Sequence, residues 1–416
     1  MQLKRVVVTG LGALTPIGNS PEEYWQNLIA GKSGAAPITR FNAEKFKTRF
    51  ACEVKNFNPE DFIEKREVRR MDPFTHYALY TSDQAVKDAG LLESKINPDR
   101  VGVVWGSGIG GLTSFSQEIA DFARGDGTPR FTPFLIPKMI GDIAAGYISI
   151  KYGFRGPNYS IVSACATSSH SMMDAFNLIK LGKADVIVTG GSEACITEAA
   201  VGGFNSMKAL SENNDNYKTA SKPYDKTRDG FVLGEGSAAL ILEEYEHAKA
   251  RGAKIYAEIV GAAATGDAYH ITAPHPEGLG VIAVMKNALE EANMLPKDID
   301  YINTHGTSTP LGDIAEVKAI QTVFGSETDN LNISSTKSMT GHLLGGAGAI
   351  EAIAAIKSIQ EGIVPPTINH VVFDEAFNPK LNFTFNVAQK RVINAALSNT
   401  FGFGGHNASI IFKKID

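Results

Sequence analysis

The chain has 416 residues, which is beyond the usual size of one compact core, so we expect two domains or one large duplicated domain. Its net charge of −5, with 43% hydrophobic and 20% charged residues, gives no reason to expect nucleic acid as a partner. The three cysteines lack paired spacing, which argues against a disulfide framework or a zinc site. Without an apolar run typical of a signal peptide or a membrane span, we expect a cytoplasmic protein with no membrane partner.

The first predicted strand runs into a glycine-spaced turn, VVVTGLGALTPIG at residues 6–18. Dinucleotide-binding domains begin in this way, because helix N–H groups after such a turn bind a pyrophosphate. Gly10 and Gly12 fit G-x-G-x-x-G, but Thr15 takes the third glycine position and Pro16 follows it. The Tyr-x-x-x-Lys pairs at 147–151 and 245–249 match a loose reductase pattern that discriminates poorly. We therefore favour a strand that leaves the core through a tight loop over a nicotinamide site.

Strand-like and helix-like segments alternate along the rest of the chain. A helix is predicted near residues 75–89, a strand at 101–108, a helix after Ser169 and a strand at 184–191. A similar series follows, with a strand at 255–266, a helix at 281–295 and a small-residue helix within 341–359. This rhythm predicts an α/β protein of two similar halves, residues 1–255 and 256–416, related by a pseudo-twofold axis. Residues 211–230 form a long, polar and functional loop between predicted elements.

Three strand-to-helix turns carry residues with catalytic chemistry. Cys165 in YSIVSACATSS precedes a helix whose positive end would lower the thiol pKa, although a lone cysteine is more often an inert core residue. His305 in THGTSTP follows a strand, and SSTKSMTGHLLGGAGAIEA supplies Lys337, His342 and Glu351. A fourth stretch, SNTFGFGGHNA, has glycines that leave backbone N–H groups free to face a ligand.

Taken together, these four stretches resemble the β-ketoacyl-[acyl-carrier-protein] synthases, and most closely the type II enzymes of dissociated fatty-acid synthesis. The resemblance extends from end to end of the chain, including VVVTGLGALTPIG. It implies a thiolase-like α/β fold with αβαβα layers, in which the opening stretch is the first strand and binds no nicotinamide. It also implies a homodimer that acts on substrates carried by the phosphopantetheine of acyl carrier protein, without a metal or redox cofactor.

The resemblance implies a decarboxylative Claisen condensation with a role for each motif. Cys165 takes the acyl group, and its own N–H and that of Phe403 form the oxyanion hole. His305 and His342 stabilise the enolate that forms when malonyl carrier protein loses CO2, while Lys337, paired with Glu351, orders the site. The product is a β-ketoacyl carrier protein two carbons longer.

Further positions follow from the same resemblance. Expected substrate-binding residues are Thr307, Thr309, Phe204, Ile109 and Phe401. Expected contacts with the acidic carrier are Arg66, Arg69, Arg70, Arg130 and Lys208. A structural monovalent cation is expected at Asn303, Glu351, Ser398 and Asn399. The chain departs from the family's FGFGGTN at His406, which predicts altered gating and pH response of the loop that carries Phe403.

Other interpretations remain open on the sequence alone. A polyketide ketosynthase would share the fold and chemistry but use a different acyl substrate, and a non-catalytic carrier-binding scaffold would have an unreactive Cys165. A biosynthetic thiolase would need a second cysteine near the C-terminal glycine loop, where the chain has none. The preferred acyl chain length is not predicted.

Overall fold

Apolar and β-branched runs form one continuous ten-stranded sheet in the computed structural model, which describes residues 3–415. The first part of the chain supplies β1 (Val6–Leu14), β4 (Val101–Gly106), β5 (Asn158–Ile161), β6 (Val186–Glu193) and β7 (Gly236–Glu244). The second part supplies β8 (Ala257–Gly266), β9 (Tyr301–Asn303), β10 (Asn332–Ser334), β13 (Ala395–Gly402) and β14 (His406–Lys413). Two small sheets pair β2 (Ala36–Pro37) with β3 (Phe50–Ala51), and β11 (Ile363–Val364) with β12 (Gln389–Lys390).

The two parts of the chain repeat the same strand order. The order β5-β4-β6-β7-β1 in the first part is matched by β10-β9-β13-β14-β8 in the second. In both sets the first three strands are parallel, and the last two run antiparallel to their neighbours. The sets join where residues 6–8 of β1 pair with residues 257–259 of β8. This repeat is the topology expected of a duplicated fold, whereas the division at residue 255 stays a prediction.

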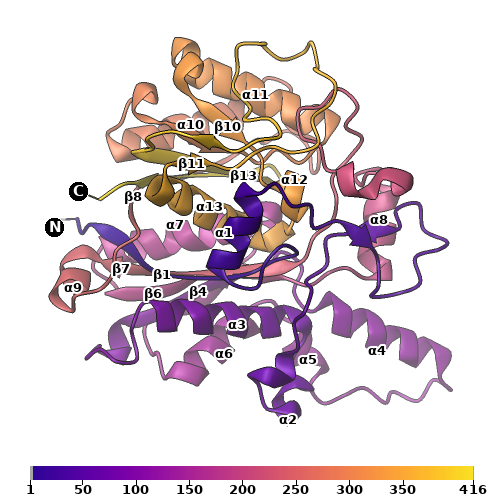
Figure 1. Cartoon of the computed structure of the whole chain (residues 1–416). Coiled ribbons are helices and arrows are strands. Elements are labelled where there is room, and N and C mark those ends of the chain that lie inside the picture. Colours follow the sequence, from indigo (N-terminus) through magenta and orange to yellow (C-terminus); the bar gives the residue numbers. More distant parts are fainter. Residues whose placement is uncertain (1–2, 416) are drawn as a thin grey trace.

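Helices form three layers around the two halves of the sheet (Figure 1). α7 (Thr167–Lys180) and α13 (Ala347–Glu361) lie between the halves and share their core with both. α3 (Pro73–Asp88) and α6 (Ile143–Tyr152) cover one outer face, while α10 (Leu279–Ala292) and α11 (Pro310–Phe324) cover the other. The predicted α-β-α-β-α layering is confirmed.

The remaining α-helices are additional to these three layers. They are α1 (Pro21–Ile29), α2 (Lys65–Val68), α4 (Leu112–Arg124), α5 (Leu135–Met139), α8 (Glu198–Ser206), α9 (Tyr245–Ala250) and α12 (Lys337–Thr340). Among residues 3–415, no helix combines the length and the apolar character needed to span a lipid bilayer.

The glycines of β1 serve helix packing. A methyl group at Gly10 or Gly12 would collide with the backbone carbonyl oxygens of Ala85 and Thr81, so both glycines let α3 approach the strand. The whole of β1 is buried in the middle of the sheet. The favoured interpretation of the opening stretch, a core strand followed by a tight loop, therefore accounts for its glycines.

Candidate active site

Cys165 lies in a short turn that connects β5 to α7. The residue is 7% exposed, and Ala164 before it has a φ of 50°, a left-handed conformation that costs energy for any residue with a side chain. α7 begins at Thr167 without a side-chain cap on its first turn. The turn therefore presents the thiol at a helix N-terminus, as predicted, although the helix begins three residues earlier than expected.

The hairpin between β13 and β14 brings a distant chain segment onto the thiol. Gly402 packs so closely that a methyl group there would lie 2.7 Å from the carbonyl oxygen of Ser163 and 3.1 Å from the nitrogen of Cys165. The backbone N–H groups of Phe403 and of Cys165 itself face the sulfur. Two N–H groups that converge at one reactive atom can stabilise the charge that develops on a thioester oxygen.

Burial raises the pKa of the Cys165 thiol to about 12. The positive charge of Lys337 and the N–H of Phe403 oppose this rise without overcoming it. The predicted lowering of the thiol pKa is therefore wrong for the resting site, because lost hydration outweighs the favourable helix end. The thiol is protonated at neutral pH and must give up its proton when a substrate arrives.

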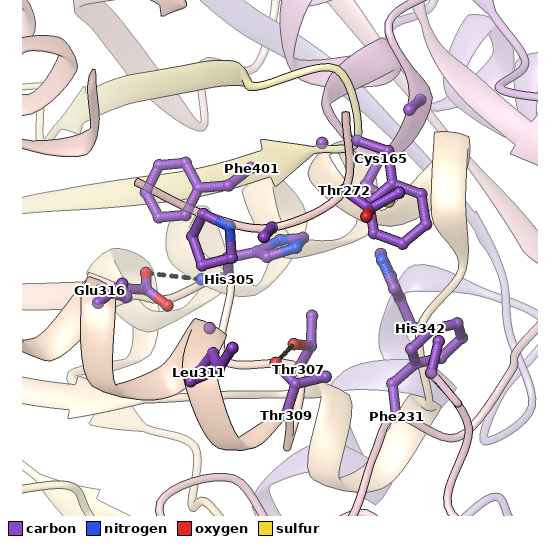
Figure 2. Close-up of a pocket in the computed structure, with 18 of the residues that line it drawn as sticks. Cys165, Phe231, Thr272, His305, Thr307, Thr309, Leu311, Glu316, His342 and Phe401 are labelled. Carbon is purple, nitrogen blue, oxygen red and sulfur yellow. Dashed lines mark hydrogen bonds between the residues drawn. The ribbon is translucent and has the colours of Figure 1, made fainter. Parts of the chain in front are cut away.

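A cavity of about 550 Å³ reaches the thiol. Figure 2 shows five predicted residues on its wall, His305, His342, Thr307, Thr309 and Phe401. The wall also includes the predicted residues Phe403, Phe204 and Ile109. The Tyr-x-x-x-Lys pairs lie on α6 and α9, away from this wall. Residues up to about 300 positions apart in sequence thus meet around one mainly apolar space that can hold an acyl chain.

The turn that carries His305 is held by a buried carboxylate. Glu316 on α11 accepts hydrogen bonds from the backbone N–H of His305 at 2.9 Å and of Gly306 at 2.8 Å (Figure 2). Burial raises the pKa of Glu316 to about 7. Sequence analysis missed this residue, since an acidic side chain between apolar residues of a helix carries no signal for a partner eleven positions earlier.

His342 lies opposite His305. Its backbone N–H donates to the carbonyl oxygen of Val232 at 2.8 Å, and its own carbonyl oxygen accepts from Gly234 at 2.9 Å. The two imidazole rings are 5.2 Å apart between centroids and nearly perpendicular. Neither Nδ1 atom has a hydrogen-bond partner within residues 3–415, so the rings are placed by packing and by their backbones.

Both imidazoles are neutral at physiological pH. Burial is the main cause that holds the pKa of His305 and of His342 well below 6.5, and the positive charge of Lys337 lowers both further. A neutral ring keeps one N–H to donate while its proton remains too tightly held to quench a carbanion. The site therefore supplies two neutral hydrogen-bond donors next to one thiol.

Lys337 and Glu351 form a buried ion pair, with side chains 2% and 1% exposed. Lys337 begins α12, and Glu351 lies in the central helix α13. Burial raises the pKa of Glu351 to about 7, and the neighbouring ammonium opposes this rise. Because the pair is packed between the halves of the chain, it fixes a positive charge close to both histidines.

Thr307 and Thr309 place their hydroxyl groups side by side on the cavity wall, with the two Oγ1 atoms 3.0 Å apart (Figure 2). Exposure increases from buried Thr307 to half-buried Thr309 and exposed Leu311, so this wall leads out to solvent. The hydroxyls can bind an extended polar arm that enters from outside.

Aromatic rings line the remaining wall. Phe204 packs edge-on against Phe231 at 5.3 Å, Phe231 packs edge-on against His342 at 5.4 Å, and Phe401 lies 5.7 Å from His305. Sequence analysis missed Phe231, although it directly follows the long polar loop at 211–230.

Ile109 is fixed by another buried carboxylate that sequence analysis missed. Glu193, at the end of β6, accepts from the backbone N–H of Ile109 at 3.2 Å and of Gly108 at 2.9 Å. It also accepts from Gly345 at 3.0 Å, three residues after His342. Glu193 thus ties the loop of the cavity wall to the segment that carries one of the histidines.

The predicted carrier-binding residues do not form one patch on the chain. Lys208 is exposed and borders the cavity. Arg66, Arg69 and Arg70 lie on and next to α2, which is far from α8 in Figure 1. Arg70 lies 5.0 Å from the ring of Phe134, which connects this cluster to the loop of Arg130.

The residues predicted to hold a monovalent cation include several buried polar atoms without partners in the described chain. These atoms are Oδ1 and Nδ2 of Asn303, Oγ of Ser398 and Oε2 of Glu351. Asn399 differs, since its Oδ1 accepts from Ser409 at 2.6 Å. Unpaired oxygens suit a hard cation. Within residues 3–415, no group of three His, Cys, Asp or Glu side chains could bind a metal ion.

His406, the departure from the family motif, packs onto the glycine loop. A methyl group at Gly404 would lie 2.7 Å from Nε2 of His406, and Gly404 has a φ of 88°. The loop that carries Phe403 is therefore covered by an imidazole ring. His170, whose Nδ1 lies 2.7 Å from Oγ of Ser163, completes the packing behind the Cys165 turn.

Comparison with known proteins places this geometry in a family. The model of the beta-ketoacyl synthase N-terminal domain matches residues 3–248, and that of the C-terminal domain matches residues 256–371. A 3-oxoacyl-[acyl-carrier-protein] synthase 2 of Staphylococcus aureus is 50% identical over 100% of this chain and 99% of its own.

Solved structures agree with these matches. A beta-ketoacyl synthase from Burkholderia phymatum has a TM-score of 0.92 at 35% identity, over 99% of this chain and all of its own. A type II polyketide ketosynthase, solved with its acyl-carrier protein and bound to a hexaketide, has a TM-score of 0.90 at 33% identity, with both chains fully covered. With its thiolase-like fold and one cysteine and two histidines around a single cavity, the chain belongs to the beta-ketoacyl synthase family.

Proposed function

We propose that this enzyme condenses an acyl group held on Cys165 with malonyl carrier protein in fatty-acid elongation. The observation that carries the proposal is the convergence of a thiol, two backbone N–H groups and two neutral imidazoles on one apolar cavity. The 50% identical 3-oxoacyl-[acyl-carrier-protein] synthase 2 supports the same reaction.

In the first half-reaction, Cys165 attacks the thioester of an acyl carrier protein. The N–H groups of Cys165 and Phe403 stabilise the negative oxygen of the tetrahedral intermediate. The C–S bond to the carrier breaks, and the thiol proton of Cys165 ends on the released phosphopantetheine sulfur. The acyl chain remains as a thioester in the cavity, with Phe204 and Ile109 on its wall.

In the second half-reaction, malonyl carrier protein binds with its arm along Thr307 and Thr309. The bond to the carboxylate breaks, CO2 leaves, and its electron pair forms an enolate whose oxygen accepts hydrogen bonds from His305 and His342. The enolate carbon attacks the acyl thioester, and the Cys165 sulfur leaves and takes a proton from solvent. The reaction is redox-neutral, so it needs no electron carrier.

The unpartnered oxygens of Asn303, Ser398 and Glu351 could hold a monovalent cation. Such an ion would supply a fixed positive charge that satisfies these buried oxygens. The residues present fit that structural role.

Reconstitution with purified carrier protein tests this proposal. We expect malonyl carrier protein and saturated acyl carrier proteins to give β-ketoacyl carrier proteins two carbons longer, detected by mass spectrometry of the carrier. Products of repeated condensation without reduction would instead favour a polyketide role, which the similarity to the hexaketide-bound ketosynthase makes the second candidate. If neither kind of product forms, the result would favour a non-catalytic scaffold.

We propose that acyl carrier protein docks beside Lys208, the exposed cation that borders the cavity. Arg66, Arg69, Arg70 and Arg130 would form a second basic contact with the carrier, separate from Lys208. Lys208→Glu is expected to raise KM for carrier substrates about tenfold at low salt and less at high salt, because charge attraction is screened. Lys249→Glu on α9 is the matched exposed control, and equal effects of the two changes would contradict the docking site.

We also propose a homodimer in the cytoplasm. β5 is an edge strand of the sheet, and the exposed apolar residues Tyr159 and Val162 lie on and just after it. α4 also exposes the apolar residues Phe115, Ile119 and Phe122. A reducing compartment would preserve the Cys165 thiol. A sedimentation mass twice the chain mass of 44.5 kDa is expected, and a single-chain mass at micromolar concentration would contradict the dimer.

A further inference from the structure

The turn between β9 and α11, which carries His305, Thr307 and Thr309, has an unusual backbone. Ser308 has a φ of 67°, in the left-handed region that residues with side chains avoid. Such a conformation persists only when its surroundings determine it. Groups from other segments must therefore hold this turn in place.

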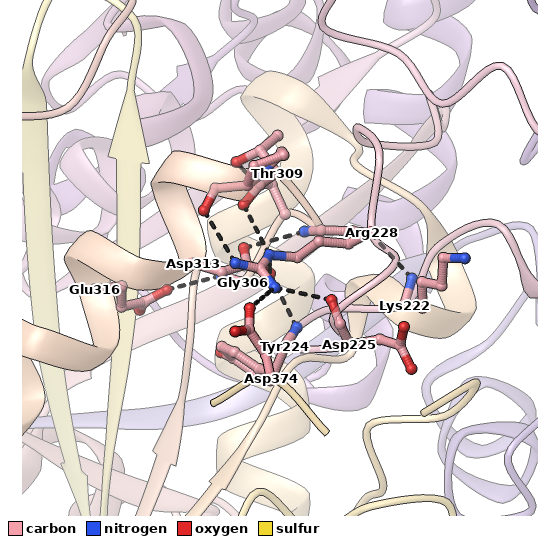
Figure 3. A network of polar contacts seen from close by, with 12 residues as sticks. Lys222, Tyr224, Asp225, Arg228, Gly306, Thr309, Asp313, Glu316 and Asp374 are labelled. Carbon is pink, nitrogen blue, oxygen red and sulfur yellow. Dashed lines mark hydrogen bonds and ion pairs between the residues drawn. The ribbon is translucent and has the colours of Figure 1, made fainter. Parts of the chain in front are cut away.

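The segment at residues 222–230 is one of these supports. The N–H of Gly230 donates to the carbonyl oxygen of Ser308 at 3.1 Å, and Oγ of Ser308 accepts from the N–H of Lys222 at 3.1 Å. The hydroxyl of Tyr224 pairs with that of Thr304. The long polar loop predicted from the sequence thus lies against the turn that carries the site residues (Figure 3).

Arg228 is the centre of this contact. Its side chain is 3% exposed, and it donates to the carbonyl oxygens of Pro310 at 3.0 Å and Thr309 at 3.3 Å (Figure 3). Thr309 is the N-cap residue of α11 and Pro310 is its first residue, so both carbonyl oxygens lie at the start of this helix. The planar guanidinium can hold two such oxygens at once, which an ammonium group cannot do with the same geometry.

Two carboxylates balance and orient Arg228. Asp374 accepts from Nη1 at 2.6 Å, and Asp313 lies 3.5 Å from Nε. Asp313 also accepts from the backbone N–H of Ser308 at 3.2 Å and of Tyr224 at 3.0 Å. The network therefore connects three separate chain segments to one turn.

α11 also leaves space for one of the hydroxyls. A methyl group at Gly312 would lie 2.5 Å from Oγ1 of Thr309 and 3.6 Å from Oγ1 of Thr307. Gly312 has no positive φ, so alanine suits its helical backbone. The absence of a side chain at this position allows the Thr309 hydroxyl to lie where it does.

We propose that Arg228 is a positioning residue for the carrier's thioester arm: by holding the carbonyl oxygens of Thr309 and Pro310, it fixes the paired hydroxyls of Thr307 and Thr309. This inference rests on the proposed function, in which those hydroxyls bind the arm. Arg228 does not line the cavity, so it acts through the turn and not on the substrate.

Steady-state kinetics with malonyl carrier protein test the inference. Arg228→Lys is expected to raise KM about tenfold and to change kcat by less than about threefold, because it disturbs arm binding and leaves the thiol and imidazoles in place. The rate of Cys165 alkylation by iodoacetamide, a reagent without an arm, is expected to stay within about twofold of the wild type. Lys226→Met, which removes the exposed ion pair with Glu375, is the control and should change neither quantity.

Two further variants keep the test decisive if Arg228→Lys folds poorly. Arg228→Met with Asp374→Asn removes one buried cation together with one anion, and it should reproduce the rise in KM. Gly312→Ala leaves the ion pairs intact and should raise KM through the Thr309 hydroxyl without lowering the melting temperature.

Thr307→Val with Thr309→Val separates the possible failures. If this double variant leaves KM unchanged, the proposed arm site is wrong. If it raises KM while the Arg228 variants do not, the arm site stands and the role of Arg228 is overturned. Adding Arg228→Lys to the threonine double variant should raise KM no further, and additive effects on KM would show that Arg228 acts independently of the hydroxyls.

Discussion

Cys165→Ser is expected to lower the rate of condensation by about 10³-fold or more without unfolding the protein. A serine hydroxyl ionises far less readily than a thiol. Within residues 3–415, Nδ1 of His305 and Nδ1 of His342 have no carboxylate partner that would make either ring a strong base. The change is nearly isosteric, and the N–H groups that face the sulfur can donate to the hydroxyl oxygen. The measurement is the initial rate of β-ketoacyl carrier protein formation, with circular dichroism as the test of folding.

Cys195→Ser is the matched control for this variant. Cys195 is fully buried in the same apolar cluster as Cys165 but is absent from the cavity wall. We expect this control to keep at least about a third of the wild-type rate. A Cys165→Ser enzyme within tenfold of the wild type would show that the thiol is not the nucleophile.

His305→Ala and His342→Ala are each expected to lower the rate of malonyl decarboxylation by about 10²- to 10³-fold. Each change removes one of two neutral donors that face the developing enolate oxygen. Transfer of the acyl group to Cys165 should be affected less, since the N–H groups of Cys165 and Phe403 serve that step. Release of CO2 from malonyl carrier protein and acylation of the enzyme are measured separately. Equal losses in both steps would contradict the division of roles.

The pH dependence of decarboxylation follows from the same pair. Burial, assisted by Lys337, lowers the pKa of His305 and His342, so the neutral form persists below pH 6.5 and the acid limb of the profile should lie below that value. Lys337→Met with Glu351→Gln removes the positive charge without leaving a buried carboxylate unpaired. The pKa of both rings should then rise, and the acid limb should move to higher pH. Identical acid limbs in the two proteins would contradict this electrostatic role.

Sequence patterns located the reactive residues because each lies in its own strand-to-helix turn. Cys165 and His305 directly follow strand-like runs, and His342 opens the small-residue helix predicted within 341–359, although the structure places the short helix α12 between β10 and His342. A duplicated fold brings equivalent turns together, so the repeat itself predicted that these residues share a pocket. The cavity wall agrees with that expectation.

The supporting residues could not be predicted in this way. Glu316 holds His305 from one helix, Glu193 connects two distant loops, and Arg228 acts on carbonyl oxygens about 80 positions away. Their partners are backbone groups, which leave no mark on the sequence. The prediction of a lowered thiol pKa was wrong for a related reason. The helix end is a local feature of the sequence, whereas burial comes from the packing of distant segments around Cys165.

The most direct test is the intact mass of the enzyme after incubation with acyl carrier protein charged with a medium or long acyl chain. The account predicts a single acyl increment on the wild type, none on Cys165→Ser, and loss of the increment as β-ketoacyl carrier protein when malonyl carrier protein is added. Folded enzyme that gains no increment with any chain length, or an increment that persists in Cys165→Ser, would contradict the assignment of Cys165 as the acyl-carrying nucleophile.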